Sequence, residues 1–278
     1  MNNRRVVIIT GASSGIGFFI SQRLEKIYNL ILISKTESKL KKCNEKLEHD
    51  HSFYSIDISD KKQVEKFFHN LKNDIDEVYG LINCAGIFGG IGKISQVNPK
   101  DFDKAFNVNF FGSYYMNYFA LRFYRSHGLK KIINFSGGGA TYPFPRYSSY
   151  ACSKIALVKL TENLAIEYPN IDCNIIAPGF INTNLAQQTL NAGKDRAGDF
   201  YDKTIDMLHE GGQPVTKVAG LIKFLLSKKS QKISGKFISA QWDNWEDIDF
   251  QKKLRSEKDL CTLRRIDDLN FTLINERI

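Results

Sequence analysis

Short apolar runs alternate with amphipathic stretches along most of the chain, and this alternation restricts the fold more than any other feature. VVIIT (6–10) and LILIS (30–34) are each followed by a segment whose apolar residues recur at helical spacing. Further strand-like runs cover residues 53–59, 78–86, 130–136, 172–179 and 235–240. Apolar strands that alternate with helices predict an α/β fold, a doubly wound parallel sheet of about seven strands with helices on both faces.

The predicted sheet belongs to a single domain, residues 1–240, because no linker rich in Pro, Gly or Ser divides it. Residues 184–213 interrupt the last strand–helix unit with a polar stretch that contains glycines. Residues 241–278 form a C-terminal extension with too few apolar residues for a domain of its own. Trp242 and Trp245 are costly to leave exposed, so we expect them to pack against a neighbouring subunit or against the 184–213 segment.

Composition excludes several classes of protein. With 42% hydrophobic and 25% charged residues, the chain of 278 residues is of ordinary soluble globular type, and it has no apolar run of membrane-spanning length. The five cysteines are scattered singly, which predicts neither a disulfide framework nor a metal site and favours a reducing cytoplasm. The net charge of +9 is spread without a basic tract, so we expect no nucleic-acid partner, whereas a basic body suits a small ligand that bears phosphate.

The segment TGASSGIG directly follows the first predicted strand and precedes an amphipathic helix. In that location Gly11, Gly15 and Gly17 can turn tightly, admit a pyrophosphate to bare backbone and let the helix pack on the strand. The alternative is an ordinary strand–helix turn, which does not explain three glycines and two serines. The position of this segment predicts a Rossmann-like dinucleotide site.

The end of the second strand reads Ser34, Lys35, Thr36, where an NAD site would carry a carboxylate for the ribose hydroxyls. A hydroxyl followed by an ammonium suits a 2′-phosphate better, through charge-assisted hydrogen bonds. We therefore favour NADP(H) as the cofactor and keep NAD(H) as the alternative, in which Lys35 is only a solvated charge at a helix start.

Tyr150 and Lys154 lie four residues apart in the predicted helix 148–168 and therefore share one helix face. A tyrosine can exchange a proton with a reacting oxygen, but its unperturbed pKa of about 10 is too high for a base at neutral pH. Lys154 can supply the positive charge that favours the phenolate. The spacing alone is a weak signal, and the alternative is an exposed helix pair.

Seven segments, in order along residues 4–240, together resemble the short-chain dehydrogenase/reductase family in its compact single-domain branch. They are TGASSGIG, IDIS with Asp57, NCAG (83–86), NVNFFG with Asn109, IINFS, YACSK and PGFINT (178–183). The resemblance implies that Asn109 holds a water in the proton path and that Tyr150 and Lys154 are catalytic. It also implies dimers or tetramers, formed through the helices of residues 99–126 and 148–168.

The glycine turn, the second strand end and the resemblance together predict the residues that bind the cofactor. They are Gly11, Ser13, Ser14, Gly15, Ile16, Gly17, Ser34, Lys35, Asp57, Ile58, Asn83, Ala85, Gly86, Tyr150, Lys154, Pro178, Gly179, Ile181 and Thr183. In the resemblance Asp57 and Ile58 meet the adenine, and the residues of PGFINT hold the nicotinamide carboxamide. All of these segments follow parallel strands, where open α/β sheets bind ligands.

One catalytic group departs from the family pattern. The hydroxyl that polarises the substrate oxygen typically stands about thirteen residues before the tyrosine, and here that position is Gly137, with Ser136 just upstream. Three alternatives follow. The run Gly137–Gly139 lets the backbone rotate so that Ser136 enters the site, another donor substitutes, or Tyr150 activates the carbonyl alone.

The prediction for function is an NAD(P)(H)-dependent oxidoreductase that interconverts a secondary alcohol and a carbonyl. The alternative is a nucleotide-binding sensor or scaffold on the same fold that has lost turnover. We expect Gly138–Tyr147, Phe180 and a lid of residues 184–213 to close over a small-molecule substrate. The polar residues of that lid suit a polar or anionic substrate, or belong to a solvated face; they are Gln187, Gln188, Lys194, Arg196 and His209.

Overall fold

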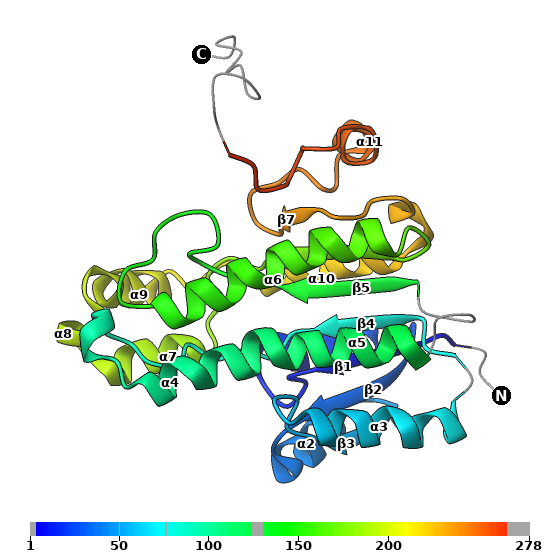
Figure 1. Cartoon of the computed structure of the whole chain (residues 1–278), viewed down its shortest axis with the longest axis horizontal. Coiled ribbons are helices and arrows are strands. Elements are labelled where there is room, and N and C mark those ends of the chain that lie inside the picture. Colours follow the sequence, from blue (N-terminus) through cyan, green and yellow to red (C-terminus); the bar gives the residue numbers. More distant parts are fainter. Residues whose placement is uncertain (1–3, 50, 76, 124–129, 266–278) are drawn as a thin grey trace.

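Seven parallel strands form one sheet in the order β3-β2-β1-β4-β5-β6-β7, as Figure 1 shows. The computed structural model describes residues 4–49, 51–75, 77–123 and 130–265. The strands are β1 (Val6–Thr10), β2 (Asn29–Ser34), β3 (Ser52–Ser55), β4 (Gly80–Asn83), β5 (Lys131–Phe135), β6 (Asp172–Ala177) and β7 (Phe237–Ser239). The chain starts at the middle of the sheet, winds outward to β3 and then builds the other half from β4. This order confirms the predicted doubly wound, Rossmann-like sheet.

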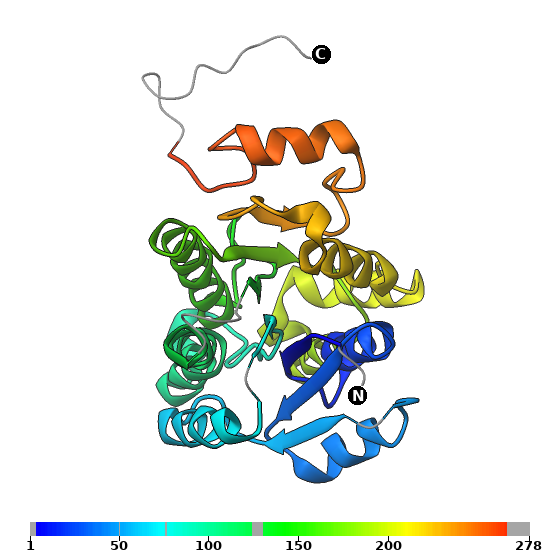
Figure 2. The same cartoon turned by 90° about the vertical axis from the view of Figure 1, so that its right-hand side faces the viewer.

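Helices cover both faces of the sheet, as Figure 2 shows end-on. They are α1 (Gly15–Leu24), α2 (Glu37–Asn44) and α10 (Val215–Leu226) on one face, and α3 (Lys61–Asp74), α5 (Ser113–Phe123) and α6 (Ser148–Glu167) on the other. Side chains alternate along each strand, so Val7 and Ile9 of β1 join the first core whereas Ile8 joins the second. Both faces of the central strands are therefore buried, which explains why β1, β2, β4 and β5 read as nearly unbroken apolar runs, whereas the edge strand β3 is partly exposed.

Within the described residues, the predicted helical stretch 99–126 divides into three pieces that end at Phe123, and residues 124–126 lie outside the described part of the chain. α4 (Pro99–Phe106) begins with Pro99 in the first turn and a cap from the Asn98 side chain, and it continues into the π-helical segment η2 (Asn107–Gly112) before α5. Wide turns of this kind are rare and often lie at functional sites. Here the wide turn carries Asn109.

The polar stretch 184–213 is helical as well. It folds into α7 (Asn184–Ala192), α8 (Lys194–Ala197) and α9 (Asp199–His209), separated by Gly193 and Gly198. The described residues also contain two 3-10 turns, η1 (Ile94–Gln96) and η3 (Lys228–Ser230). None of the helices that the structure describes, in any part of the chain, has the length and apolar character needed to cross a bilayer.

The C-terminal extension packs on the domain that precedes it. Trp245 is buried against α10, so close that a Cβ on Gly220 would lie 2.9 Å from its ring. α11 (Ile248–Ser256) follows and lies beside β7 in Figure 1. The expectation that Trp245 packs against another subunit or the 184–213 segment is therefore wrong, because this indole fills a gap in its own sheet–helix core. The side chain of Trp242, in contrast, is 70% exposed.

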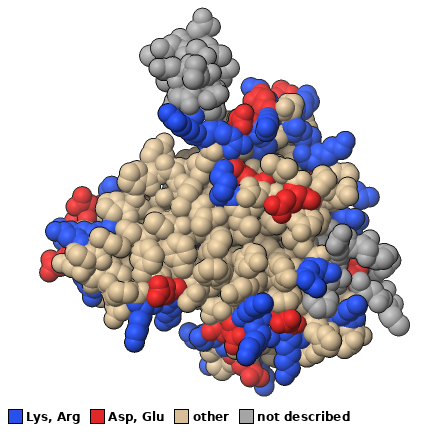
Figure 3. Space-filling view, in the orientation of Figure 1, with Lys and Arg blue, Asp and Glu red and all other residues tan. Residues whose placement is uncertain are grey.

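Charged residues of both signs are interspersed on the surface. In Figure 3 they gather around the rim of one face, whereas the broad central part of that face, over α5 and α6, carries few charges. Exposed large apolar side chains of this region include Phe111 on η2, Tyr114 on α5 and Ile155 on α6.

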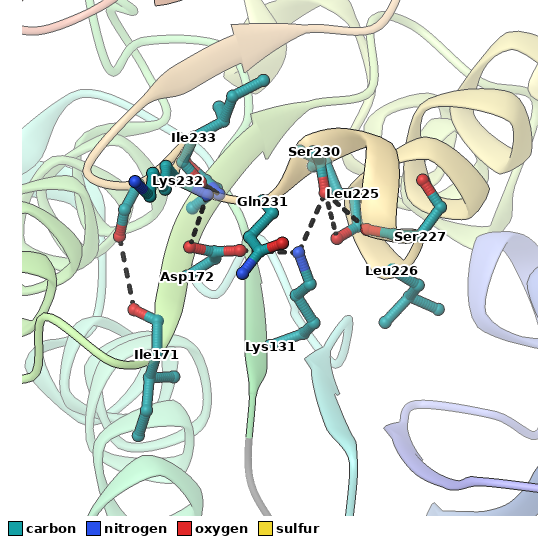
Figure 4. Close-up of polar contacts among 12 residues, drawn as sticks. Lys131, Ile171, Asp172, Leu225, Leu226, Ser227, Ser230, Gln231, Lys232 and Ile233 are labelled. Atoms are coloured by element: carbon teal, nitrogen blue, oxygen red, sulfur yellow. Dashed lines mark hydrogen bonds and ion pairs between the residues drawn. The ribbon is translucent and has the colours of Figure 1, made fainter. Parts of the chain in front are cut away.

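A buried ion pair ties the amino ends of two neighbouring strands. Lys131 begins β5, and its ammonium lies 2.6 Å from Asp172, which begins β6. Figure 4 shows that the same ammonium also donates to the hydroxyl of Ser230, which itself donates to the carbonyl of Leu225 at the end of α10. The lysine is 4% exposed, so this network satisfies a charge that would otherwise be costly to bury.

Candidate active site

Two adjoining cavities open at the carboxyl edge of the sheet. The glycine-turn cavity, about 740 Å³, is lined by the turn after β1 and by the segments that follow β2 and β4. The tyrosine cavity, about 750 Å³, is lined by Tyr150, the Gly137–Gly139 run and the 178–183 loop. Ile16, Thr183 and Leu185 line both, so the two cavities share a wall.

The turn after β1 brings bare backbone to the first cavity. Gly11 has a φ of +70°, and a Cβ on it would lie 2.9 Å from the Cα of Ala85. A Cβ on Gly17 would lie 2.4 Å from the carbonyl oxygen of Gly11. Neither position can carry a side chain without movement of the backbone, so both glycines are needed for α1 to approach the strand ends closely.

The first turn of α1 offers backbone amides to this cavity. Ser14 precedes the helix, and its side chain makes no capping hydrogen bond to these amides. The helix dipole places partial positive charge at the same point, which suits a diphosphate. The bare backbone and the unclaimed amides therefore fit a dinucleotide, and Ser13, Ser14, Gly15 and Ile16 would lie along it.

The groups predicted to choose between the two cofactors form pairs with one another. The hydroxyls of Ser13 and Ser34 lie 2.6 Å apart, and the Lys35 ammonium lies 2.6 Å from a carboxylate oxygen of Asp57. Burial opposes ionisation of Asp57, but hydrogen bonds from Lys35 and Ser59 outweigh it and hold its pKa below the ordinary value. The Lys35 side chain remains 74% exposed beside the glycine-turn cavity.

Tyr150 and Lys154 lie in the first half of α6; Tyr150 lines the tyrosine cavity, whereas Lys154 lines neither cavity and lies beside Gly86 of the glycine-turn cavity. The Tyr150 ring packs edge-on against Phe88, with 4.9 Å between ring centroids, and the Lys154 ammonium lies 5.7 Å from its centre. That ammonium donates to the carbonyl of Phe135, at the end of β5, over 2.8 Å. Burial lowers the pKa of Lys154 to about 8 and raises that of Tyr150, with a further upward contribution from Cys84. The ligand-free site therefore holds a neutral phenol.

Asn109 joins the wide turn η2 to the strand end and to α6. Its side-chain oxygen accepts from the amide of Ile87, and its amide nitrogen donates to the carbonyl of Ile87 and to the hydroxyl of Ser153. Ser153 in turn donates to the carbonyl of Tyr150. A Cβ on Gly86 would lie 3.3 Å from both Asn109 and the Lys154 ammonium, so these groups converge at one point.

The strand end before the glycine run separates Ser136 from the phenol. Gly137 faces it directly, because a Cβ at that position would lie 2.0 Å from the Tyr150 hydroxyl oxygen. The Ser136 amide continues the sheet by donating to Ile176, and its hydroxyl is buried without a partner among the described residues. Ser136 lines neither cavity, since successive side chains in a strand point to opposite faces.

Asn83, at the end of β4, also lies apart from both cavities. Its amide nitrogen donates to Asn117 and Asn134 over 2.8 Å in each case, so the residue braces the buried ends of two strands. The hydroxyl of Thr10 performs a related task, because it accepts from the amides of Cys84 and Ala85. Burial raises the pKa of the Cys84 thiol to about 12, which keeps it protonated. Sequence reasoning assigned Asn83 to the cofactor and missed Thr10.

The loop after β6 brings Pro178, Gly179, Ile181 and Thr183 to the tyrosine cavity. A residue of the C-terminal extension supports it, because the Gln241 side chain donates to the carbonyl of Pro178 over 2.8 Å. Sequence reasoning did not find Gln241, since nothing local in the chain signals a contact across 63 residues.

The 184–213 segment closes the tyrosine cavity with its apolar side. Leu185, Ala186, Phe200 and Met207 line that cavity, whereas only one of the five polar residues named for the lid reaches either cavity. That residue, Gln188, lines the glycine-turn cavity. The others are held elsewhere: Gln187 bonds to Asn191, Lys194 pairs with Asp202, Arg196 donates to the carbonyl of Gln96, and His209 is exposed at the end of α9. Of the two alternatives for these five residues, the structure therefore favours the solvated face, because the helices turn their apolar side to the cavity.

Comparison with known proteins identifies relatives among dehydrogenases and other oxidoreductases. A family model described as short chain dehydrogenase matches residues 5–194. An Arabidopsis thaliana protein, "11-beta-hydroxysteroid dehydrogenase-like 3", is 33% identical over 189 residues, which are 66% of this chain and 60% of that protein. The "uncharacterized oxidoreductase YusZ" of Bacillus subtilis is 29% identical over 282 residues, 91% of this chain and 100% of that protein.

Among solved structures, the ligand-free aldohexose dehydrogenase of Thermoplasma acidophilum superposes with a TM-score of 0.72. It is 27% identical and covers 86% of this chain and 93% of its own. With the family model matched over most of the fold and the glycine turn, tyrosine and lysine assembled at one edge of the sheet, the chain belongs to the short chain dehydrogenase family of oxidoreductases.

Proposed function

We propose that the protein interconverts a secondary alcohol and a carbonyl, with Tyr150 as the acid/base. One observation carries this proposal: the Tyr150 phenol lines a cavity that adjoins the glycine-turn cavity, and it lies one helical turn from a buried lysine. A nicotinamide cofactor, when bound, supplies or accepts the hydride. Gly11, Gly17 and the 178–183 loop would hold it, and Asn83 would contribute by bracing the strand ends.

The neutral state of the phenol supports a proton-donating role. Because burial raises the pKa of Tyr150, the hydroxyl keeps its proton at neutral pH and can give it to a substrate oxygen. The Lys154 ammonium then stabilises the phenolate that is left behind, at a point that water does not screen. Asn109 and Ser153 fix the first turns of α6 and so orient both groups.

The substrate oxygen receives its hydrogen bond from Tyr150 alone in this proposal. Gly137 has no hydroxyl, and the Ser136 side chain is buried away from the cavity. Entry of Ser136 would require the strand end to rotate and to give up its bond with Ile176. We expect Ser136→Ala to retain turnover within about threefold, whereas a loss near the hundredfold typical of an oxyanion donor would support the rotated arrangement.

The test of the proposed function is Tyr150→Phe, assayed by NADPH oxidation on a panel of ketones and aldehydes and by NADP⁺ reduction on alcohols. Loss of the acid/base should lower turnover by about 10³-fold and leave cofactor affinity within about twofold. Tyr142→Phe is the matched control, because this exposed tyrosine lines the same cavity. Tight cofactor binding without turnover on the whole panel would instead indicate a nucleotide-binding sensor or scaffold.

We infer that NADP(H) is preferred over NAD(H). Lys35 is exposed beside the cleft with the Ser13 and Ser34 hydroxyls, and a 2′-phosphate could take the ammonium over from Asp57. Lys35→Ala should weaken NADPH binding about tenfold and change NADH binding by less than about twofold. Lys39→Ala, on the exposed side of α2, is the control. Equal losses for both cofactors, or none, would contradict the preference.

We also infer a homodimer or homotetramer in a reducing, cytoplasmic environment. The central face in Figure 3, over α5 and α6, carries few charges, which supports assembly through this surface. Its exposed apolar side chains include Phe111, Tyr114 and Ile155. The free cysteines among the described residues support the compartment. Light scattering should give a mass of at least two chains, and Tyr114→Lys should lower it.

A further inference from the structure

The C-terminal extension builds part of the tyrosine cavity. Trp242, Asp243 and the 261–263 segment line this cavity together with Tyr150. Strong contacts hold the segment in place, because the Lys236 ammonium donates to the carbonyls of Glu257, Lys258 and Leu260. The amide of Phe237 also donates to the carbonyl of Cys261. The far wall of the cavity is therefore a built part of the fold.

Aromatic side chains form part of the remaining wall. Phe88, Tyr142, Phe144, Phe180 and Phe200 line the space between Tyr150 and the C-terminal wall. Phe144 stacks on Tyr147 with 4.4 Å between centroids and meets Phe200 edge-on, so the rings form a packed set. Such a wall recognises a flat apolar body.

Among the residues that line this cavity, Asp243 is the one with a charged side chain. One of its oxygens accepts from the amide of Ser239 over 2.7 Å and from the thiol of Cys261 over 3.8 Å. The other oxygen accepts no hydrogen bond from any described residue, and no described lysine, arginine or histidine lies within 4 Å of the carboxylate. Burial raises the pKa of Asp243, against the hydrogen bond from Ser239. The second carboxylate oxygen of Asp243 is therefore available to accept a hydrogen bond from a bound cation.

Trp242 stands next to this carboxylate on the same cavity wall. Its indole is 70% exposed, which is costly for so large an apolar side chain unless something covers it. An indole face attracts cations, and a carboxylate beside it adds a charge-assisted hydrogen bond. The pair matches the chemistry of a protonated amine.

We propose that Asp243 and Trp242 form an ammonium subsite, so that the substrate is a flat apolar amino ketone or amino alcohol. Its oxygen meets Tyr150, its body lies on the aromatic wall and its ammonium lies against Asp243. This inference rests on the proposed function for the reacting end of the substrate. It assigns to the C-terminal extension the choice of which substrate binds.

The test is calorimetric titration of the full-length protein, with and without NADP⁺, using three probes that share one apolar body: phenylbutylamine, phenylbutanol and phenylbutyrate. The wild type should bind the amine at least about tenfold more tightly than the alcohol, and the carboxylate least. Asp243→Asn should remove this advantage, because an amide keeps the bond from Ser239 but carries no charge. Trp242→Leu should lower amine affinity by about threefold.

Glu246→Gln is the matched control, because it removes an exposed acid of the same segment that does not line the cavity. It should leave all three affinities unchanged. Equal amine and alcohol binding by the wild type, or equal losses in Asp243→Asn and Glu246→Gln, would overturn the subsite. Thermal unfolding checks that Asp243→Asn folds, and Trp242→Leu gives an independent reading if it does not.

The binding measurement separates this inference from the proposed function. Amine selectivity that depends on Asp243, without turnover of any amino ketone, would support the subsite and count against the oxidoreductase. Turnover of neutral ketones without amine selectivity would do the reverse. With both intact, kcat/KM for an amino ketone should exceed that for its hydroxy counterpart, and Asp243→Asn should bring the two together.

Discussion

Two buried lysines lie at the two ends of strand β5, and they differ in the charge of their partners. Lys131 begins the strand and pairs with Asp172 and Ser230, as Figure 4 shows, whereas Lys154 reaches the carbonyl of Phe135 at the other end. Both are almost fully buried, at 4% and 2% exposure. The first has a carboxylate of its own and the second has only neutral acceptors among the described residues.

We infer from the difference that Lys131 is a structural cation and that Lys154 is available for the proposed reaction. A buried charge with a dedicated partner stabilises the position of two strands and has nothing left to offer a ligand. A buried charge without one is held at a cost, and burial accordingly lowers the pKa of Lys154 to about 8. That cost is useful only if a bound ligand or a transient phenolate supplies the missing negative charge.

The largest expected effect is the loss of turnover in Lys154→Met. Removal of the ammonium leaves the Tyr150 phenolate without stabilisation, so kcat should fall by about 10³-fold, or about 4 kcal/mol in activation free energy. Steady-state kinetics on any substrate found in the carbonyl panel measures it. Lys131→Met, assayed at a temperature where it is folded, should keep wild-type kcat, and a comparable loss there would break the comparison.

The next effect in size is the destabilisation caused by Lys131→Met. This variant leaves Asp172 buried with no cation, which should lower the free energy of unfolding by about 3 kcal/mol. Urea unfolding followed by circular dichroism gives the value. The double variant Lys131→Met with Asp172→Leu should recover most of it, and a single variant as stable as the wild type would show that the pair has no structural role.

The smallest effect, and the sharpest, is a gain of stability in Lys154→Met. Its folded-state pKa of about 8 lies below the ordinary value of 10.5, so the unfolded chain binds more protons between these values. The penalty is therefore complete below about pH 8 and disappears as pH rises toward 10.5. After the lost bond to Phe135 is subtracted, the variant should be more stable than the wild type at pH 7 by about 2 kcal/mol.

This gain should shrink as the pH approaches 10, because the folded wild-type lysine is then neutral and the unfolded one, with an ordinary pKa of 10.5, begins to lose its proton. Urea unfolding of both proteins at three pH values gives the difference directly. A variant less stable than the wild type at pH 7, or a difference that does not change with pH, would mean that Lys154 is compensated like Lys131.

The alternation of strands and helices was predictable, because each element declares itself locally through the spacing of its apolar residues. The edge of the sheet that carries the site followed from the parallel order. For the 184–213 segment the sequence left a polar cavity lining and a solvated face as alternatives, because its average polarity hid the apolar side of α7 and α9, although Phe200, Thr204 and Met207 recur at helical spacing. Orientation at a strand end was also beyond local reasoning, as Asn83 and Ser136 show.

The cavity wall contributed by Trp242 and Asp243, and the support that Gln241 gives to the loop after β6, were not predictable. Their partners lie far away along the chain, as the bond between Gln241 and Pro178 illustrates, and no periodicity encodes such a contact. The head of the extension was noticed for its tryptophans, but only the fold separates Trp245, which fills the core, from Trp242, which lines the cavity.

The order of assembly follows from where the C-terminal extension lies. The glycine-turn cavity draws its lining from residues 11–188, whereas the tyrosine cavity also needs residues 237–263. On the ribosome the nucleotide cleft therefore emerges first and the chemistry of substrate choice emerges last. A nascent chain that has emerged only as far as residue 188 contains every residue that lines the glycine-turn cavity. It still lacks residues 237–263, which complete the cavity proposed to select the substrate.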